Sequence, residues 1–503
     1  MFYYCTSIEE IVIPSTVAKI ENKAFYYCTS LSKLTFAPTP DGQEPVKLEI
    51  LDAKSYSYAP FYGCKELKEI TFPERLTYIG SYAFGGSSAT GYNHYAVYAY
   101  IEKVYLPSTL ERIGFRAFNY ADKLTTVKFA AGTVLKDLTD SKGNISASAI
   151  GEYAFDHCSA LTLLELPAAK DSKYSIGKCA FQYAGLTELA VPASVSSLGD
   201  YCFARSKIAK LTFADGAAPK INKGAFNAVS IETLVLPEGI TELGESAFAS
   251  CAKLKSVTLP YSLESLGVSA FASCTSLSKV TMTKAADGTS KLAAIGNLAF
   301  QKTLIESFVF PTLSEGKVLS LGTSLFSGCT ALDSVYLSKS VGNVNGVFTG
   351  CNTIKNFVVD PESENFSSVE GSPILYNKNG TAYKYICGLL TGSHTIPVGV
   401  TEISENVFLN QIGLTELYIP YTVQKIGANA FQGCTALTKV VFEHSAEHPS
   451  QLSVADLGNY LFAKCTSLTD VTLPANLTVI PKYMFSECTS LTTITLPAGI
   501  TEI

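Results

Sequence analysis

One segment of the chain has residues of the types and spacing found in zinc peptidases. His444, Glu447 and His448 match the pattern His-x-x-Glu-His, in which two imidazoles bind the metal beside a catalytic carboxylate. That chemistry requires both histidines on one helix and a third ligand elsewhere. The segment instead follows the apolar run 440–442 directly, without helical periodicity around it. We interpret the match as a coincidence, and a hydrolase is the weakest of our three functional hypotheses.

The sequence has no other motif of catalysis or cofactor binding. It contains no nucleophile elbow, no phosphate-binding glycine loop, no dinucleotide fingerprint and no Cys-x-x-Cys metal pair. His94, His157 and His394 are isolated along the chain. We therefore predict that the protein is not an enzyme, binds no metal and needs no cofactor.

Tyrosines suggest a chemistry of recognition, because the ring supplies contact area and the hydroxyl a polar tip at a low entropic cost. Some lie in an insertion at 85–100, and others at outward positions of predicted strands. The candidate ligand-binding surface comprises Tyr92, Tyr95, Tyr98, Tyr100, Tyr105, Tyr336 and Tyr418. The alternation of Tyr98 and Tyr100 also fits an ordinary extra strand, so binding and structural packing both stay open for the insertion.

A repeated frame must position these residues. The segment Val257-Thr258-Leu259 alternates apolar and polar residues, which predicts a strand with one buried face, and Pro260 ends it. A second short extended stretch and a 3₁₀ or helical turn around Phe271 complete the coil. The frame recurs about 18 times, at spacings down to 22–23 residues, with these anchor phenylalanines: Phe2, Phe25, Phe61, Phe84, Phe118, Phe155, Phe181, Phe203, Phe226, Phe248, Phe271, Phe300, Phe326, Phe348, Phe408, Phe431, Phe462 and Phe485.

This period predicts an α/β leucine-rich-repeat solenoid over residues 1–503, with a parallel sheet on one side and short strands with 3₁₀ or helical turns on the other. Because the chain begins and ends inside a repeat, we expect it to be a window of a longer protein. Insertions at 37–60, 130–150, 283–294, 360–400 and 443–458 follow the main strand and should gather along one edge. Asn379-Gly380 predicts a hairpin within a non-repeat module at about 360–400.

Charged residues at one outward strand slot alternate in sign between neighbouring coils. The pairs are Glu10 with Lys33, Glu69 with Lys103, Glu188 with Lys210, and Glu416 with Lys439. Stacked opposite charges favour one register, and like charges would oppose it. We interpret the stripe as a register device, with a ligand-binding stripe as the alternative.

The chain has 14 cysteines, and most of them occupy one slot, three residues after the anchor phenylalanine. Repetition of one slot predicts a column of parallel side chains, which suits a disulfide poorly. Free cysteine is a good small buried hydrophobe. We predict a buried thiol column, with a few disulfides as the alternative; Cys179, Cys202 and Cys387 lie off the slot.

The unit Leu-x-x-(Ile/Val)-x-(Leu/Phe)-Pro-x-x-(Val/Leu)-x-x-Ile-Gly-x-x-Ala-Phe-x-x-Cys, seen in 8–28, 254–274 and 414–434, resembles the BspA-like subclass of leucine-rich repeats. The resemblance covers essentially the whole chain. It implies a bacterial protein that is secreted or displayed on the cell surface, with its signal and anchor outside this segment. It also implies adhesion to other cells or to host matrix proteins such as fibronectin and fibrinogen.

Composition fits stacked coils that bury a continuous interior. Hydrophobic residues make up 47% of the chain and charged residues 16%, with a net charge of -6 and a pI of about 5.6. An acidic chain without a basic run is not expected to bind nucleic acid, and no apolar stretch is long enough to cross a membrane. We expect a monomer that binds a protein or glycan ligand on host or neighbouring cells; the alternative is a structural spacer that holds another domain away from the cell.

Overall fold

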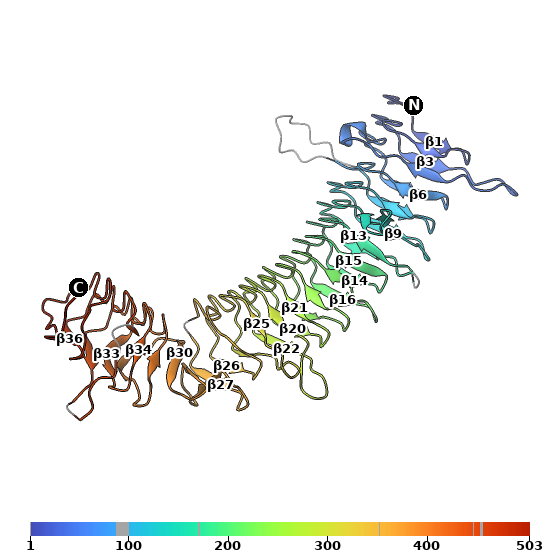
Figure 1. The fold of residues 1–503 in the computed structure, drawn as a ribbon. Coiled ribbons are helices and arrows are strands. Elements are labelled where there is room, and N and C mark those ends of the chain that lie inside the picture. Colours follow the sequence, from blue (N-terminus) through green and yellow to red (C-terminus); the bar gives the residue numbers. More distant parts are fainter. Residues whose placement is uncertain (1, 87–99, 170–171, 352, 446, 453–455) are drawn as a thin grey trace. The chain divides into compact units, whose positions relative to one another are not determined.

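The computed structural model describes residues 2–86, 100–169, 172–351, 353–445, 447–452 and 456–503. Their contacts divide the chain into two compact units. The first unit comprises Met1–Leu304 and Ser320–Phe326, and the second comprises Ile305–Leu319 and Ser327–Ile503 (Figure 1). Each unit is a stack of coils, as the repeat predicts.

Every regular coil of the first unit begins with the predicted main strand. In β20, Val257 and Leu259 are buried while Ser256 and Thr258 are half-exposed, so the period-2 pattern places one face in the core. Neighbouring main strands pair in parallel. They are β1 Glu10–Ile13, β3 Lys33–Phe36, β5 Glu69–Thr71, β7 Lys103–Leu106, β9 Thr126–Phe129, β12 Leu163–Leu164, β14 Glu188–Val191, β16 Lys210–Phe213, β18 Thr233–Val235, β20 Ser256–Leu259 and β22 Lys279–Met282.

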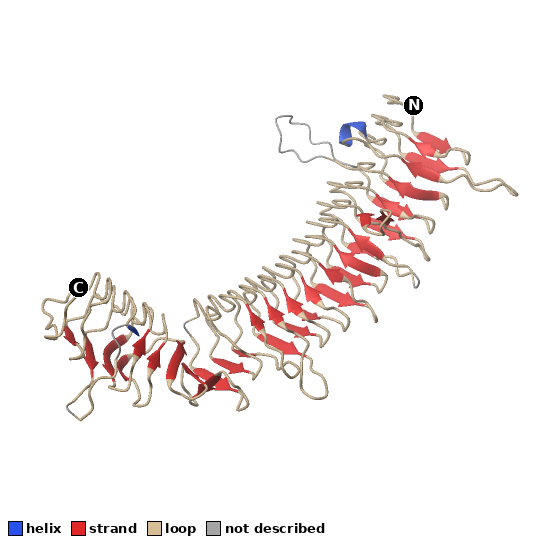
Figure 2. Cartoon of the chain, viewed as in Figure 1, coloured by secondary structure: helices blue, strands red, loops and turns tan. Residues whose placement is uncertain are grey.

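A second row of shorter parallel strands follows the proline of each coil (Figure 2). Its strands are β2 Lys19–Ile20, β4 Leu48–Ile50, β6 Leu76–Ile79, β8 Arg112–Ile113, β13 Tyr174–Ile176, β15 Val195–Leu198, β17 Lys220–Ile221, β19 Glu242–Leu243, β21 Ser265–Leu266, β23 Ala294–Ile295 and β25 Ser320–Leu321. A glycine ends most of them because the coils touch there: a Cβ on Gly267 would lie 2.6 Å from the backbone carbon of Gly244.

The turns differ from the 3₁₀ or helical turns that we expected. In the coil of Phe271, Ser269 and Ser273 both have left-handed backbone angles, with φ of 56° and 60°. The same two slots, two residues before and two residues after the anchor, are left-handed in most coils. Two left-handed residues within five positions cannot belong to a right-handed helix. The turn is instead locked to its neighbour, because the amides of Ser269 and Ser273 donate to the next coil at 2.8 and 2.7 Å.

The anchor phenylalanines form the core of the stack. In the first unit, each ring from Phe2 to Phe326 stacks on the next, with centroids 4.7–5.9 Å apart. Most of these rings are fully buried. The column explains why the phenylalanine recurs, since each ring fills the space that its neighbour would otherwise leave open.

The charged residues of the stripe lie in register, as predicted. Glu10 pairs with Lys33 across the strands and bridges it at 2.5 Å. Glu188 pairs with Lys210 at 3.3 Å, and Glu69 pairs with Lys103 at 3.8 Å. In the second unit Glu416 opposes Lys439 in register, but Lys439 bridges Asp470 instead, at 4.0 Å.

The second unit contains coils interrupted by the segment that we predicted as a hairpin. Its main strands are β24 Ser307–Val309, β26 Ser334–Leu337, β27 Asn356–Val359, β31 Gly392–Thr395, β33 Leu414–Ile419, β35 Lys439–Phe442 and β36 Asp470–Thr472. Its other sheet is β28 Phe366–Ser368, β29 Ile374–Asn377, β30 Ala382–Ile386, β32 Glu402–Ile403 and β34 Lys425–Ile426. The strands β28, β29 and β30 pair antiparallel, and β30 then pairs in parallel with β32.

The hairpin takes over the core position of a missing coil. Tyr383 of β30 is fully buried and packs its ring 5.9 Å from Phe408. From Phe408 the column continues to Phe431, at 4.9 Å. Tyr385 of the same strand lies 5.4 Å from Phe348, so β30 supplies aromatic contacts to the anchors on both sides of the interruption.

Other insertions form short secondary-structure elements of their own. Within 37–60 the chain forms the 3₁₀ helix η1 Tyr56–Tyr58. Within 130–150 it forms the antiparallel pair β10 Leu138–Thr139 and β11 Ile145–Ala147.

Candidate ligand-binding surface

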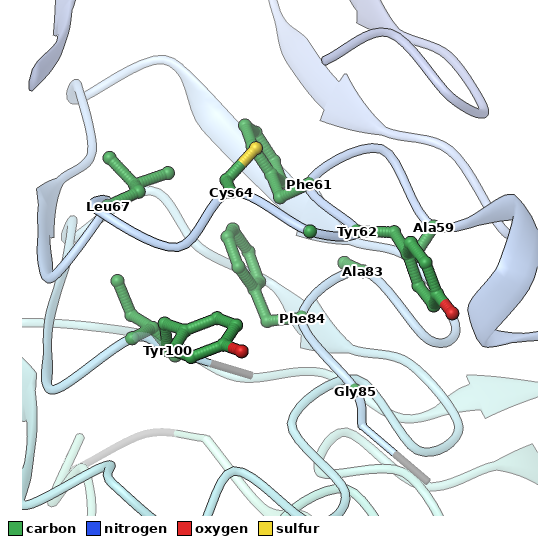
Figure 3. A pocket seen from close by; sticks show the side chains of 11 residues that line it. Ala59, Phe61, Tyr62, Cys64, Leu67, Ala83, Phe84, Gly85 and Tyr100 are labelled. Carbon is green, nitrogen blue, oxygen red and sulfur yellow. The ribbon is translucent and has the colours of Figure 1, made fainter. Parts of the chain in front are cut away.

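The insertion at 85–100 is largely outside the described residues, and so are Tyr92, Tyr95 and Tyr98. Tyr100 is half-buried and lies under Lys68, whose Nζ is 5.3 Å from the ring centroid. It lines a cavity together with Phe84 and Cys64 (Figure 3). The free volume of 20 Å³ accommodates about one water molecule, so this cavity is too small for a ligand.

The three strand tyrosines lie at separate places. Tyr105 of β7 is half-buried between Thr71 and Lys128. Tyr336 and Tyr418 belong to different sheets of the second unit. The Tyr418 hydroxyl donates to Glu416 at 3.0 Å, which raises the pKa of Tyr418. The structure thus brings none of the three together with another.

The two histidine rings of the zinc-like motif contact different partners. His444 Nδ1 is 2.8 Å from the carbonyl of Phe442, and the His448 ring stacks on Tyr421 at 4.6 Å. The described residues of the segment form no helix. Among the residues that the structure describes, no group of His, Cys, Asp and Glu could hold a metal ion.

The cysteine slot forms the predicted column, and most of its thiols donate to the anchor phenylalanine of the preceding coil. Cys274 Sγ donates to the carbonyl of Phe248, the anchor of the preceding coil, at 3.1 Å. Cys64 and Cys158 do the same to Phe25 and Phe118, at 3.1 and 3.2 Å. Burial raises the pKa of Cys64 to about 12. These thiols stay protonated and act as buried hydrogen-bond donors between coils.

A larger group of aromatic and basic side chains lies on the turn edge of the first unit, where we predicted no binding surface. We call it the aromatic edge and define it as Tyr56, Tyr82, Phe115, Arg116, Tyr120, Tyr153, His157, Tyr183 and Arg205. It contains two parallel runs of side chains, one on either side of the anchor column.

The first run occupies the left-handed slot after the anchor. Tyr120 stacks on His157 and His157 on Tyr183, with both centroid distances at 4.4 Å. The guanidinium of Arg205 then lies over Tyr183 at 5.5 Å. His157 is held from behind, because its Nδ1 is 2.8 Å from Asp156 Oδ1. Tyr183 is 37% exposed and Arg205 is exposed, so the run faces solvent.

The second run lies before the anchor. The rings of Tyr82, Phe115 and Tyr153 meet edge to face at 5.5 and 5.9 Å. Arg116 lies over Phe115 and Tyr153 at 5.1 and 5.0 Å, and its Nη1 donates to the Tyr56 hydroxyl at 3.4 Å. Cation–π contacts of this kind hold the guanidinium in place.

Earlier coils have a related tyrosine cluster. Tyr4 stacks on Tyr27 at 4.9 Å, and Tyr26 on Tyr62 at the same distance. Lys23 Nζ lies 5.2 Å from the Tyr26 centroid. Both clusters could have been predicted from the sequence, because their residues occupy the same slots beside the anchor in successive coils, as the cysteines do.

The second unit has a polar groove beside the hairpin. It measures 820 Å³ and is lined by the amides of Asn343, Asn345 and Asn365 and by the ion pair of Lys384 with Glu402, whose atoms are 3.2 Å apart.

This groove forms because the hairpin replaces the strands of a coil but not its turn. Among the described residues, the carbonyls of Glu405, Val407 and Leu409 accept no hydrogen bond. The equivalent carbonyls of Lys223, Ala225 and Asn227 accept bonds of 2.8–2.9 Å from the preceding coil. A row of backbone acceptors therefore stays open at the groove.

The model of the BspA type leucine-rich repeat region matches residues 1–42, 50–131, 91–172, 135–251, 174–287, 251–370 and 381–503. The chain belongs to the BspA-type leucine-rich repeat family. The resemblance drawn from its repeat is thereby confirmed. Proteins of this family are bacterial cell-surface proteins, and leucine-rich repeat proteins of this kind are generally non-catalytic binding proteins.

Solved structures of other leucine-rich repeat proteins are similar to this BspA-type chain. One from Bacteroides ovatus is 21% identical, with 87% of this chain and 91% of that chain covered and a TM-score of 0.46. One from Eubacterium ventriosum is 26% identical, with 54% and 81% covered and a TM-score of 0.39. A leucine-rich cell surface protein from Faecalibacterium prausnitzii is 19% identical, with 84% and 86% covered and a TM-score of 0.30.

A search of curated proteins found no match to this BspA-type chain. In the part of the chain that the structure describes, no helix combines the length and apolar character that a membrane span requires.

Proposed function

We propose that the chain is a cell-surface adhesion protein that binds a protein on host or neighbouring cells through the aromatic edge. The observation that carries this proposal is that nine aromatic, imidazole and guanidinium side chains form continuous runs on a solvent-facing edge. Family membership supports a binding role, and the edge supplies a surface for it.

The fold does not need these side chains. In the next coils, the slot of Tyr120, His157 and Tyr183 is occupied by Ala228, Ser250 and Ser273, with the same left-handed backbone. Tyrosine and arginine are the residues that dominate binding energy at protein interfaces. Their replacement by alanine and serine in equivalent turns supports selection for contact with a partner rather than for packing.

The backbone beneath the edge is rigid, which lowers the entropic cost of binding. The amides of Tyr120, His157 and Tyr183 each donate to the next coil, at 2.8, 2.8 and 3.0 Å. The rings are further held by one another. A partner would therefore meet an ordered surface.

The arrangement of the rings favours a protein over a glycan. A sugar ring stacks on the open face of an aromatic side chain, but the faces of His157 and Tyr183 are covered by their neighbours along the run. The phenol of Tyr183 and the guanidinium of Arg205 are exposed, and the other side chains of the aromatic edge are half-buried. These donors suit the carboxylates and carbonyls of a polypeptide.

The first experiment is binding of the purified chain to immobilised fibronectin and fibrinogen at physiological salt, with serum albumin as the control surface. We expect saturable binding that falls at least tenfold in the variant Tyr120→Ser/His157→Ser/Tyr183→Ser. The matched control, Ser250→Ala/Ser273→Ala, changes the same slot in coils outside the edge and should bind like the unmodified chain.

Two other outcomes would assign the binding to a different site. Binding that survives the triple substitution but is lost in Asn343→Ala/Asn345→Ala would place the contact at the polar groove. Binding lost only on deletion of residues 87–99 would place it at that insertion.

A structural spacer is the second candidate, favoured by the coils of Phe226, Phe248 and Phe271. Their outward strand residues Val235, Thr258 and Thr281 and their turn residues are small. The absence of saturable binding to any partner tested, with the fold intact, would favour this role.

A further inference from the structure

One pair of cysteines departs from the column. Cys387 lies directly after β30, off the repeated slot, and its backbone amide donates to the carbonyl of Pro373 at 3.0 Å. Its thiol donates to the carbonyl of Cys351 at 2.9 Å. The recurrent bond of the column runs from a cysteine to an anchor phenylalanine, whereas this one runs to the backbone of another cysteine. The hairpin therefore brings a second thiol against Cys351.

The two side chains come from different elements. Neighbours within the column, such as Cys251 and Cys274, occupy the same slot of successive coils, so their Cα–Cβ bonds are parallel and a disulfide between them would be strained. Cys351 occupies the column slot, but Cys387 comes from the antiparallel hairpin. The objection from parallel side chains does not apply to this pair.

The chemistry of the pair is asymmetric. The hydrogen bond from the Cys387 thiol lowers the pKa of Cys351, and burial opposes that shift. The same hydrogen bond, together with burial, raises the pKa of Cys387. A lowered thiol pKa marks the sulfur that attacks a disulfide, because the thiolate is the nucleophile.

A small oxidant has a way in. Cys387 is buried, but it lines an open pocket with Thr353, Gly388 and Leu389. Cys387 lines this pocket and Cys351 does not, so Cys387 is the thiol that a small oxidant reaches first.

We propose that Cys351 and Cys387 form a disulfide when the protein meets a low-molecular-weight disulfide such as oxidised glutathione. The Cys387 sulfur, losing its proton to water, attacks one sulfur of the oxidant, forms a mixed disulfide and releases one thiolate. The Cys351 thiolate, formed by loss of its proton to water, then attacks the Cys387 sulfur and displaces the second thiolate. Two protein thiols are oxidised to one disulfide, and one oxidant disulfide is reduced to two thiols.

The bond would fasten the hairpin to the coil that precedes it. Its loop contains β27, β28, β29 and β30, which otherwise attach to the stack through strand pairing and the packing of Tyr383. Closing a loop of this length in the unfolded state raises the melting temperature of the second unit by roughly 5–10 °C.

The test is equilibration of the full chain with a glutathione buffer at the extracellular ratio, followed by alkylation and tryptic mass mapping. Trypsin places Cys351 in 340–355 and Cys387 in 385–425. We expect these two peptides to be linked, and two of the 14 thiols to be lost to alkylation. The column pair Cys251 and Cys274, in 224–253 and 256–279, is the internal control and should be alkylated.

A second measurement separates bond formation from its consequence. The melting temperature of the oxidised chain should fall on reduction, and the variant Cys387→Ser should show no such shift. Alkylation of both Cys351 and Cys387 after equilibration would overturn the proposal, and so would a linked 251–274 pair in place of the 351–387 pair. The result does not depend on whether the aromatic edge binds a ligand.

Discussion

Two segments of the first unit have the same backbone and different surfaces. The coils of Phe118, Phe155 and Phe181 and those of Phe226, Phe248 and Phe271 share the ring column and the left-handed slots. All of them except the Phe226 coil, which has Asn222, also share the glycine before the turn. In the first segment the slot after the anchor holds Tyr120, His157 and Tyr183, and in the second it holds Ala228, Ser250 and Ser273. The backbone of the coil thus fixes the position of these side chains. The residue type at that position can vary, and can therefore be one that binds a partner.

The difference also separates two kinds of conservation that a repeat can show. Residues that fill the interior must recur, because every coil needs them to contact the next. Residues at the turn edge need only tolerate a left-handed backbone, and tyrosine, histidine, arginine and serine all do so here. Four predictions test this comparison, each with matched substitutions in the two segments.

The largest effect is expected from the anchor rings. Phe155→Ala and Phe248→Ala should each lower the free energy of unfolding by about 3–5 kcal/mol, because both rings are fully buried between two others. Urea unfolding of the full chain, followed by far-UV circular dichroism, measures this loss. A much larger loss for Phe155→Ala would mean that the aromatic edge belongs to the core, contrary to the comparison.

The second-largest loss of stability is expected at the glycines where successive coils touch. A Cβ on Gly177 would lie 2.7 Å from the backbone nitrogen of Glu152, and one on Gly267 would lie 2.6 Å from Gly244. Gly177→Ala and Gly267→Ala should each cost about 1–3 kcal/mol through overpacking. The same unfolding experiment tests both, and a neutral result at either site would show that the coils can move apart there.

The left-handed slot should respond to side-chain shape in both segments. At Ser250, with φ of 62°, Ser250→Val should cost about 1–2 kcal/mol because a branched Cβ crowds the preceding backbone. Ser250→Gly should be neutral or stabilising. At His157, with φ of 60°, valine should cost more than at Ser250, since the ring stack is lost as well. Equal losses would indicate that the stack contributes no stability.

The smallest effect concerns the stack alone. A double-mutant cycle of His157→Ser and Tyr183→Ser should give a coupling energy of about 0.5–1.5 kcal/mol, the range for aromatic pairs. The cycle of Ser250→Ala and Ser273→Ala should give none within error. Coupling between the serines would show that the backbone, rather than the rings, transmits the effect.

Much of the fold could be predicted from particular residues. The 18 anchor phenylalanines predicted the repeated coils, and the alternation in 257–259 predicted β20 with its buried face. The opposite charges of Glu188 and Lys210 predicted a register that the structure confirms. These features depend on contacts between equivalent positions of successive coils, so a single period in the sequence is enough to pair them.

The candidate site was harder to predict, because we expected binding tyrosines in insertions and on strands rather than in the turns. Tyr105, Tyr336 and Tyr418 proved to be dispersed. The aromatic edge depends on the backbone of the turn, and nothing in Tyr120 or His157 as a residue type indicates a left-handed conformation, which usually favours glycine. Backbone hydrogen bonds between successive turns stabilise that conformation for large side chains.

The sequence by itself determined the repeat, its period, the inward residues of each coil and the membership of the BspA-type family. Only the folded backbone brings different slots together: the contacts of Arg116 with Phe115 and Tyr56 in the aromatic edge, the groove beside the hairpin, and the approach of Cys387 to Cys351. The physical reason is that periodicity relates equivalent slots only. Contacts between different slots, or between a coil and an inserted hairpin, depend on how the backbone turns in space.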